Sequence, residues 1–159
     1  MNINELRKYV ENVCQNSAYV FQNEEQFRYA LAKALESKGQ KVVVQKLEID
    51  PISNKYIYVD IVVEANDGSY DFVELKYGKK NDLKNNLVCL SNASFIPNNG
   101  DRKKGFEADK TRLKGIVDAY NGKVRGFVVL LTNRNYRALT PLFEPLINNV
   151  KFNCYIEQI

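Results

Sequence analysis

Three residues on two adjoining apolar segments have the types and the spacing that metal-assisted chemistry needs. Asp60 is the one acid inside the apolar run of residues 58–63, and Glu74 and Lys76 follow in the next apolar segment. Side chains alternate along a β-strand, so Glu74 and Lys76 would share one face while Leu75 points to the other. Two carboxylates and an amine on a sheet can hold a divalent cation and activate a water against a phosphodiester.

The same residues also allow a structural interpretation. Charged residues near strand ends are often solvated or salt-bridged, and Glu-x-Lys is a common tripeptide. Apolar neighbours, however, predict that both strands are buried, and buried charges are rare unless they are paired or bind a ligand. These neighbours are Val59, Ile61, Val62 and Val63 around Asp60, and Phe72, Val73, Leu75 and Tyr77 around Glu74 and Lys76.

The turn between the two segments decides whether the carboxylates can meet. Residues 66–69, Asn-Asp-Gly-Ser, are typical of a hairpin turn. A three-residue loop ending at Gly68 pairs Ala65 with Ser69 and brings Asp60 opposite Glu74, whereas a two-residue turn sends the carboxylates to opposite faces. We therefore predict an odd-length loop or a bulge, with Gly68 at positive φ.

Apolar periodicity and turn residues predict the elements that position these side chains. Asn23 is the expected N-cap of the second helix, with Gln26 at its third position. The predicted order is α, α, β, β, β, α, β, α, β in a single α/β domain spanning residues 1–159. The expected ranges are helices at 3–15, 24–38, 106–120 and 141–148, and strands at 41–49, 55–65, 70–78, 126–131 and 151–156, with a further short strand at 87–90.

Composition excludes several classes of site. The chain has no histidine, which excludes Ser-His-Asp and Cys-His catalysis and histidine-ligated zinc. Its eight glycines form no phosphate-binding loop, and its three cysteines form no C-x-x-C pair and are expected to be small core residues. No apolar run approaches the roughly 20 residues that span a bilayer. We expect a cytoplasmic protein without a membrane partner.

Basic charge is concentrated directly after the carboxylate strand. Residues 76–114 contain ten basic and four acidic side chains, a net charge of +6 that leaves −2 for the rest of a chain whose total is +4. Such a segment could meet a polyanion, or it could be a solvated loop and helix surface. Tyr56, Tyr58, Tyr70 and Tyr77 flank the same strands, where they could stack on splayed bases or pack in the core.

The core order α-β-β-β-α-β, with Asp60 on the second strand and Glu74-Leu75-Lys76 on the third, resembles the PD-(D/E)XK nuclease superfamily, whose fold is that of restriction endonucleases. The resemblance covers roughly residues 23–132. Val59 stands where the family motif has its proline. The sequences of residues 109–113 and 126–133 also look like those of a group of uncharacterised bacterial members.

The resemblance implies a restriction-endonuclease-like core, a central mixed β-sheet flanked by helices, with an added N-terminal helix and C-terminal strand. It implies a Mg²⁺- or Mn²⁺-dependent nuclease acting on DNA, in which Asp60, Glu74 and the carbonyl of Leu75 bind the metal and Lys76 assists the attacking water. Many such enzymes form homodimers. The implied nucleic-acid contacts come from the basic segment: Lys79, Lys80, Arg102, Lys103, Lys104 and Arg112.

The family also has an acid on its first core helix, for which Glu24 and Glu25 are the candidates. Glu24 is preferred because its spacing to Phe27 and Leu31 places it on the inward face, although an acid there could equally favour the helix dipole. Arg112 could reach a phosphate or form an i,i+3 ion pair with Asp109. Two other functions stay open: a nucleic-acid-binding module that has lost catalysis, and an α/β interaction protein with structural salt bridges.

Overall fold

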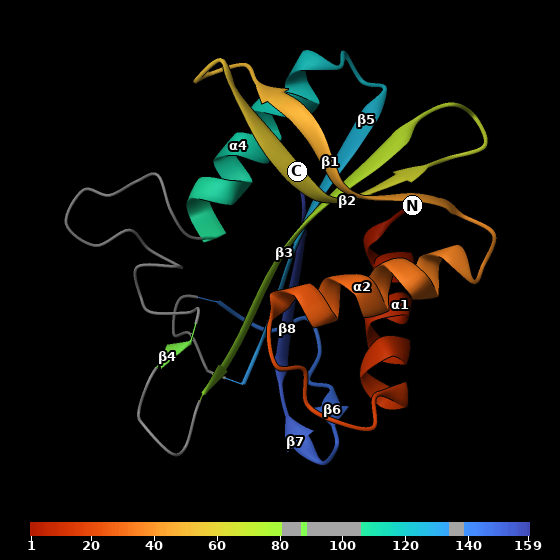
Figure 1. Ribbon diagram of the computed structural model, residues 1–159, viewed down its shortest axis with the longest axis vertical. Helices are drawn as coiled ribbons and strands as arrows, with labels where there is room; N and C mark the ends of the chain where they lie inside the picture. The colour runs from red at the N-terminus through yellow and green to blue at the C-terminus, as the bar shows by residue number, and fades with distance from the viewer. Residues whose placement is uncertain (81–86, 89–105, 134–138) are drawn as a thin grey trace.

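The structure is a computed structural model that describes residues 1–80, 87–88, 106–133 and 139–159 of the chain. Residues 79, 80, 87, 88, 106 and 107 are described by their backbone alone. The elements (Figure 1) are α1 (Ile3–Asn16), α2 (Glu24–Glu36), β1 (Lys41–Asp50), β2 (Lys55–Glu64), β3 (Tyr70–Lys80), β4 (Leu87–Val88), α4 (Phe106–Ala119), β5 (Val124–Thr132), β6 (Leu146–Ile147), β7 (Val150–Lys151) and β8 (Asn153–Gln158).

A mixed sheet forms the centre of the described fold. Its strand order is β1-β2-β3-β5-β8, and β4 pairs with the end of β3. β3 and β5 are parallel, and the other neighbours are antiparallel. Helices α1 and α2 cover one face and α4 covers the other (Figure 1). The predicted α/β class with a central mixed sheet is confirmed.

Two apolar cores lie on the two faces of this sheet. On the α1 and α2 side, Leu31 packs with Leu75, and on the α4 side, Leu113 packs with Phe72. Residues 127–131 of β5 alternate between these cores, which explains why this strand is a continuous apolar run. Full burial of each such side chain contributes about 1.5–3 kcal/mol. Glu74 and Lys76 therefore extend from a strand that is held rigidly on both faces.

Side-chain caps fix where the first two helices begin. Asn2 and Glu5 form a capping box on α1. The carboxamide oxygen of Asn23 accepts a hydrogen bond from the backbone N–H of Gln26 at 2.9 Å, so the predicted cap of α2 is confirmed. Such a cap contributes about 1 kcal/mol. Among the described residues, no helix combines the length and the apolar character that crossing a membrane requires.

The prediction of a helix at residues 141–148 is wrong. This segment instead contains β6, which pairs with β7 in a two-residue hairpin. Asn148 and Asn149 have φ of 47° and 63°, as a type I′ turn requires and a helix forbids. Pro145 lacks the N–H that a helix interior needs, and its carbonyl accepts a hydrogen bond from Phe152 at 2.8 Å.

The loop between β2 and β3 has the predicted register. Ile61 faces Val73, and the backbone N–H of Ala65 donates to the carbonyl of Ser69 at 2.9 Å. The loop is thus three residues long and ends at Gly68, whose φ is 77°. The observed pairing ends at Ile61, and the same register continued by one residue places Asp60 opposite Glu74, as the proposed site requires.

Replacing Gly68 should destabilise the fold without touching the site. We expect Gly68→Ala to lower the free energy of unfolding by about 1 kcal/mol, because a Cβ at this φ is strained. Gly68→Asn should cost less, since asparagine tolerates the left-handed region. Urea denaturation measures both variants. Equal stability of Gly68→Ala and the unchanged protein would contradict the assigned turn.

Candidate active site

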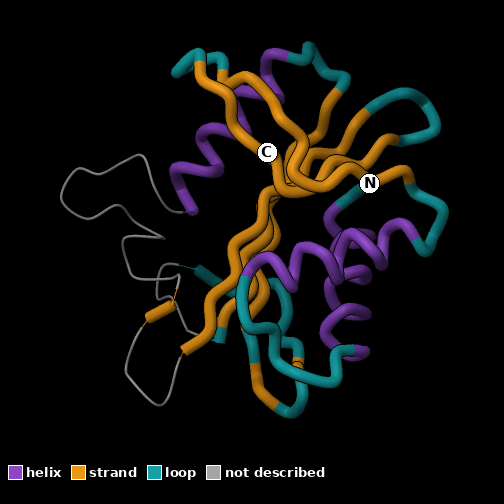
Figure 2. Tube along the Cα trace, viewed as in Figure 1, coloured by secondary structure: helices purple, strands orange, loops and turns teal. Residues whose placement is uncertain are grey.

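Strand β2 separates from β3 at Asp60, and this divergence creates the candidate site. The pairing of β2 with β3 begins only at Ile61. On the other side of β2, the residue opposite Asp60 is Gln45 of β1, which is not paired with it and has a φ of 52°. In Figure 2 the free end of the β1–β2 hairpin and the far end of β3 lie in different parts of the molecule. A continued ladder would have given the N–H of Leu75 a backbone partner on β2.

The side chain of Asp60 replaces that missing backbone partner. Its Oδ2 accepts a hydrogen bond from the N–H of Leu75 at 2.8 Å. Its Oδ1 lies 2.8 Å from Nε of Arg28 on α2, and each side chain of this ion pair is only 10% exposed. Burying a carboxylate this deeply is costly unless it is paired and hydrogen-bonded, and here it is both.

Helix α2 supplies an acid to the same place. Oε2 of Glu24 accepts a hydrogen bond from the backbone N–H of Tyr77 at 3.1 Å, and Oε1 lies 3.7 Å from Nη2 of Arg28. Burial raises the pKa of Glu24; Lys76 opposes this rise, and the charge of Asp60 adds to it. Glu25 is exposed. The predicted inward orientation of Glu24 is confirmed.

Glu74 is the most strongly perturbed carboxyl group of the site. Burial, followed by the negative charge of Asp60, raises the pKa of Glu74 from 4.5 to about 8. Lys76, a hydrogen bond from the backbone N–H of Asp60, and Arg112 act in the opposite direction. At neutral pH and without a bound cation, Glu74 is therefore mostly protonated.

This shift predicts how stability depends on pH in the absence of divalent cations. Between about pH 4.5 and about pH 8 the folded state keeps a proton on Glu74 that the unfolded state has lost. The free energy of unfolding should therefore fall as the pH rises through this window. Glu74→Gln should remove that decline and be more stable than the unchanged protein above pH 8. Glu25→Gln, at an exposed position, is the control. Identical pH profiles for all three proteins, measured by urea denaturation, would contradict the raised pKa of Glu74.

Lys76 is held by an acid from α4, the helix that covers the face of the sheet on which Lys76 lies. Its Nζ lies 2.8 Å from Oδ2 of Asp109 on α4, and Asp109 also pairs with Arg112 one turn further on. Asp109 is 3% exposed, so this acid is shared by two cations at the bottom of the site. A narrow crevice beside it, between β2 and α4, is lined by residues that include Val59 and Glu74.

The structure brings the four predicted catalytic residues together, and it adds two that sequence reasoning missed. Arg28 was not predicted, although it lies one helical turn after Glu24 on the same face. Asp109 was expected only as the partner of Arg112, a pair that is present. Of the predicted nucleic-acid contacts, Arg112 joins the site. Lys79 and Lys80 continue β3 but their side chains lie outside the description, and Arg102, Lys103 and Lys104 lie outside the described residues.

The donor set of the site is compatible with a hard cation. Within the described ranges, no three or more His, Cys, Asp or Glu side chains are grouped as a ready metal site. The backbone N–H of Asp60 nevertheless donates a hydrogen bond to Glu74, and the charge of Asp60 raises the pKa of Glu74. Magnesium commonly binds through one or two carboxylates, with waters and substrate phosphates completing its shell.

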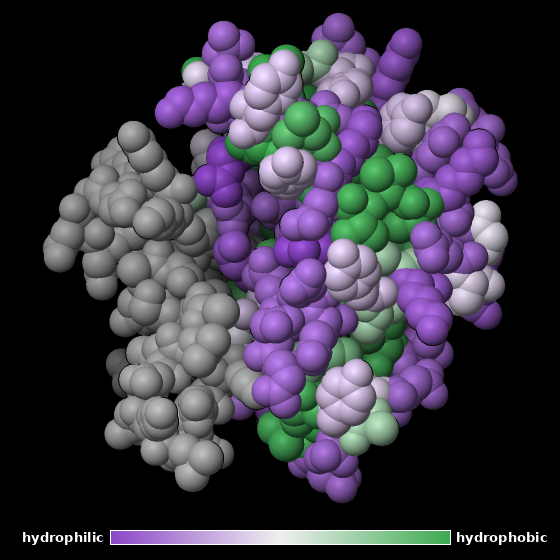
Figure 3. Space-filling model, viewed as in Figure 1, coloured by the Kyte–Doolittle hydropathy of each residue, from purple (hydrophilic) through white to green (hydrophobic). Residues whose placement is uncertain are grey.

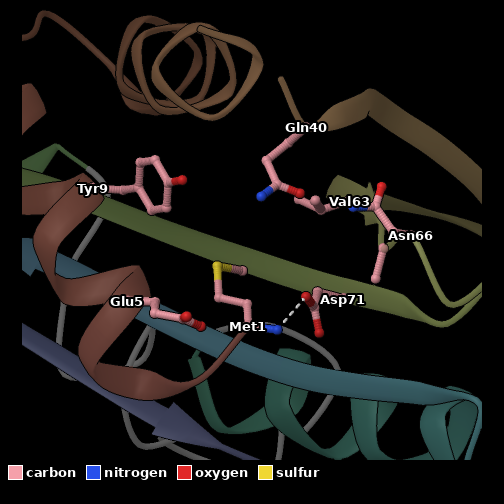
Figure 4. Close-up of a pocket in the computed structure, with 8 residues that line it drawn as sticks. Met1, Glu5, Tyr9, Gln40, Val63, Asn66 and Asp71 are labelled. Carbon is pink, nitrogen blue, oxygen red and sulfur yellow. Dashed lines mark hydrogen bonds and ion pairs between the residues drawn. The ribbon is translucent and has the colours of Figure 1, made fainter. Parts of the chain in front are cut away.

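A separate pocket of about 250 Å³ lies away from these residues, against the start of α1 and the β2–β3 turn. Figure 4 shows Glu5, Gln40 and Asn66 around it, with the amino group of Met1 2.9 Å from Asp71. None of the candidate catalytic side chains lines this pocket, so its size does not bear on the proposed chemistry.

Comparisons with protein-family models, with curated proteins and with solved structures give no match for this chain. The function is therefore inferred from the geometry and the chemistry of the site described above.

Proposed function

We propose that this protein is a metal-dependent nuclease that hydrolyses phosphodiester bonds in DNA. The observation that supports this most is the convergence of Glu24, Asp60, Glu74 and Lys76 where β2 leaves β3. These residues come from three elements far apart in the sequence. Their order and types are those of the PD-(D/E)XK resemblance, and the three-residue loop at Gly68 provides the register that this constellation needs.

In this proposal Asp60, Glu74 and the carbonyl of Leu75 would hold Mg²⁺ or Mn²⁺. The N–H of Leu75 faces Asp60, and in a strand the carbonyl of the same residue faces the same edge. Such a cation supplies a Lewis acid for the phosphate and lowers the pKa of water. Binding requires Glu74 to lose its proton, so the affinity for the cation rises with pH up to about 8.

The remaining groups orient the reaction and balance its charge. Asp109 fixes Nζ of Lys76 at 2.8 Å and holds Arg112 beside it. The two cations can together neutralise charge that develops on a phosphate. Glu24, anchored on the N–H of Tyr77, places a further acceptor at the edge of the site. Its position suits orientation of an incoming water through a hydrogen bond.

The test is cleavage of labelled DNA by the full chain. Single-stranded, duplex and plasmid DNA are incubated with Mg²⁺, Mn²⁺ or Ca²⁺, or with EDTA, and RNA of the same sequence is included. The proposal expects cleavage of at least one DNA with Mg²⁺ or Mn²⁺ and none with EDTA. Absence of cleavage with every DNA and cation would overturn it, as would cleavage that EDTA leaves unchanged.

One observation favours a second candidate, a nucleic-acid-binding module that has lost catalysis. Both oxygens of Asp60 are already engaged, one by Arg28 and one by the N–H of Leu75. A fold that satisfies this carboxylate internally does not need a cation there. Salt-sensitive DNA binding without cleavage under any of the above conditions would support this function instead.

A further inference from the structure

The outer half of the β1–β2 hairpin presents large apolar and aromatic side chains to solvent. Leu47 is opposite Tyr58 and Ile49 is opposite Tyr56, and these four are 48%, 62%, 52% and 71% exposed, respectively. We refer to them as the hairpin platform. Figure 3 shows green and pale side chains gathered at the top of the molecule, where Figure 1 draws this hairpin.

The platform is exposed because the hairpin changes faces at the point where β2 leaves the sheet. Before this point Val42 and Val44 pack toward α1 and α2, and beyond it Val59 and Ile57 pack toward α4. The alternate residues of the outer half are thereby turned away from both cores. Neither Tyr56 nor Tyr58 belongs to either core formed by the described residues.

The platform leads directly into the candidate active site. Tyr56, Tyr58 and Asp60 occupy alternate positions of β2, so the two rings and the carboxylate lie in one row. Alternate residues of a strand are about 6.7 Å apart. This spacing is roughly twice the 3.4 Å rise per nucleotide of stacked DNA. A nucleic-acid strand whose backbone is stretched could therefore place one base on each tyrosine ring.

The charges around the platform suit a polyanion. Within residues 46–59, all of which are described, the exposed charged side chain is Lys55. Glu48 is bonded to the hydroxyl of Tyr120 and to Lys46, and Asp50 is buried against Ser53. A nucleic-acid strand crossing the platform thus meets two exposed tyrosine rings and one exposed cation, and no carboxylate of residues 46–59 is exposed.

We propose that the hairpin platform stacks unpaired bases, so that single-stranded or locally melted nucleic acid is the substrate class of this protein. The inference rests on the proposed function for its choice of a nucleic-acid ligand. The two rings offer the sequence-tolerant base contacts that single-strand-binding proteins use. A second copy of the chain fits less well, because a stable interface takes roughly 20–30 residues a side and the platform has four.

Binding without cleavage tests the platform separately from the nuclease proposal. Fluorescence anisotropy in EDTA compares a labelled 15-mer single strand, its duplex, and a 15-mer of abasic sites that keeps the phosphates. We expect the base-containing strand to bind most tightly. Tyr56→Ala and Tyr58→Ala should each weaken the affinity for this strand about 10-fold and leave the affinity for the abasic strand unchanged. Tyr56→Phe and Tyr58→Phe should retain affinity, because they keep the ring.

Tyr19, 57% exposed and far from the hairpin, is the matched control, and Tyr19→Ala should bind like the unchanged protein. Equal affinity for the single strand, duplex and abasic strand would overturn the inference, as would equal losses at Tyr19 and Tyr58. A dimer in light scattering that Tyr58→Ala dissociates, together with no binding of nucleic acid, would also overturn it. The protein could also bind bases through Tyr56 and Tyr58 and yet never cleave DNA. That result would support the platform proposal and overturn the nuclease proposal.

Discussion

Glu74→Gln and Asp60→Asn should each reduce metal-dependent cleavage by on the order of 10³-fold. Each change removes one of the two carboxylates that lie where β2 and β3 diverge. Lewis-acid catalysis contributes several kcal/mol to such a reaction, and each 1.36 kcal/mol corresponds to a tenfold change in rate. Initial rates on the best DNA substrate, measured across a Mn²⁺ titration, give the size of the loss.

Unfolding cannot account for a loss of activity in Glu74→Gln, because this variant is expected to be more stable than the unchanged protein at pH 8 without cations. Asp60→Asn keeps an oxygen that can accept the hydrogen bond from Leu75. Glu25→Gln, one residue from Glu24 but exposed, should cleave normally. If Glu74→Gln and Asp60→Asn both cleave at a rate within about threefold of the unchanged protein, Glu74 and Asp60 have no catalytic role. If Glu25→Gln loses as much activity as they do, the assay reports general damage to the protein.

Local rules predicted the parts of the site that lie on one strand or in one turn. Alternation along β3 predicted that Glu74 and Lys76 share a face, and the loop length at Gly68 predicted the register in which Ile61 lies opposite Val73. The cap at Asn23 set the start of α2 and thereby the inward orientation of Glu24. Each of these inferences needs only neighbours within a few residues.

Contacts between distant elements could not be predicted in this way. Arg28 reaches Asp60 only because β2 leaves the sheet at that residue, and no spacing within α2 indicates this. Asp109 reaches Lys76 from α4, which packs on the face of the sheet that carries Lys76. Both contacts depend on how helices are docked on the two faces, which is a tertiary property that periodicity does not encode. The structure thus gathers the predicted residues, but sequence reasoning missed Arg28 and the role of Asp109, the two partners that balance their charges.

Arg28 leads to a prediction about stability: Arg28→Met should destabilise the metal-free protein by about 3 kcal/mol. The guanidinium of Arg28 lies 2.8 Å from Asp60 and 3.7 Å from Glu24, and it is the one described cation within ion-pair distance of Asp60. Methionine keeps much of the packed stem but leaves these acids without their partner. Removing one member of a buried ion pair typically costs about 3–5 kcal/mol, because a buried charge is left uncompensated. Urea denaturation in EDTA at pH 7 measures the change.

A control and a rescue distinguish this loss from ordinary packing damage. Lys114→Met breaks an exposed 2.8 Å ion pair with Asp118 and should cost less than about 1 kcal/mol. Arg28→Met/Asp60→Asn should be less destabilised than the two single changes combined, because the unpaired charge is gone. If the carboxylates bind a cation as proposed, Mg²⁺ should raise the Tm of Arg28→Met more than that of the unchanged protein, since the cation no longer competes with the guanidinium for Asp60. Stability of Arg28→Met within 0.5 kcal/mol of normal in EDTA would show that the Asp60 charge does not depend on Arg28.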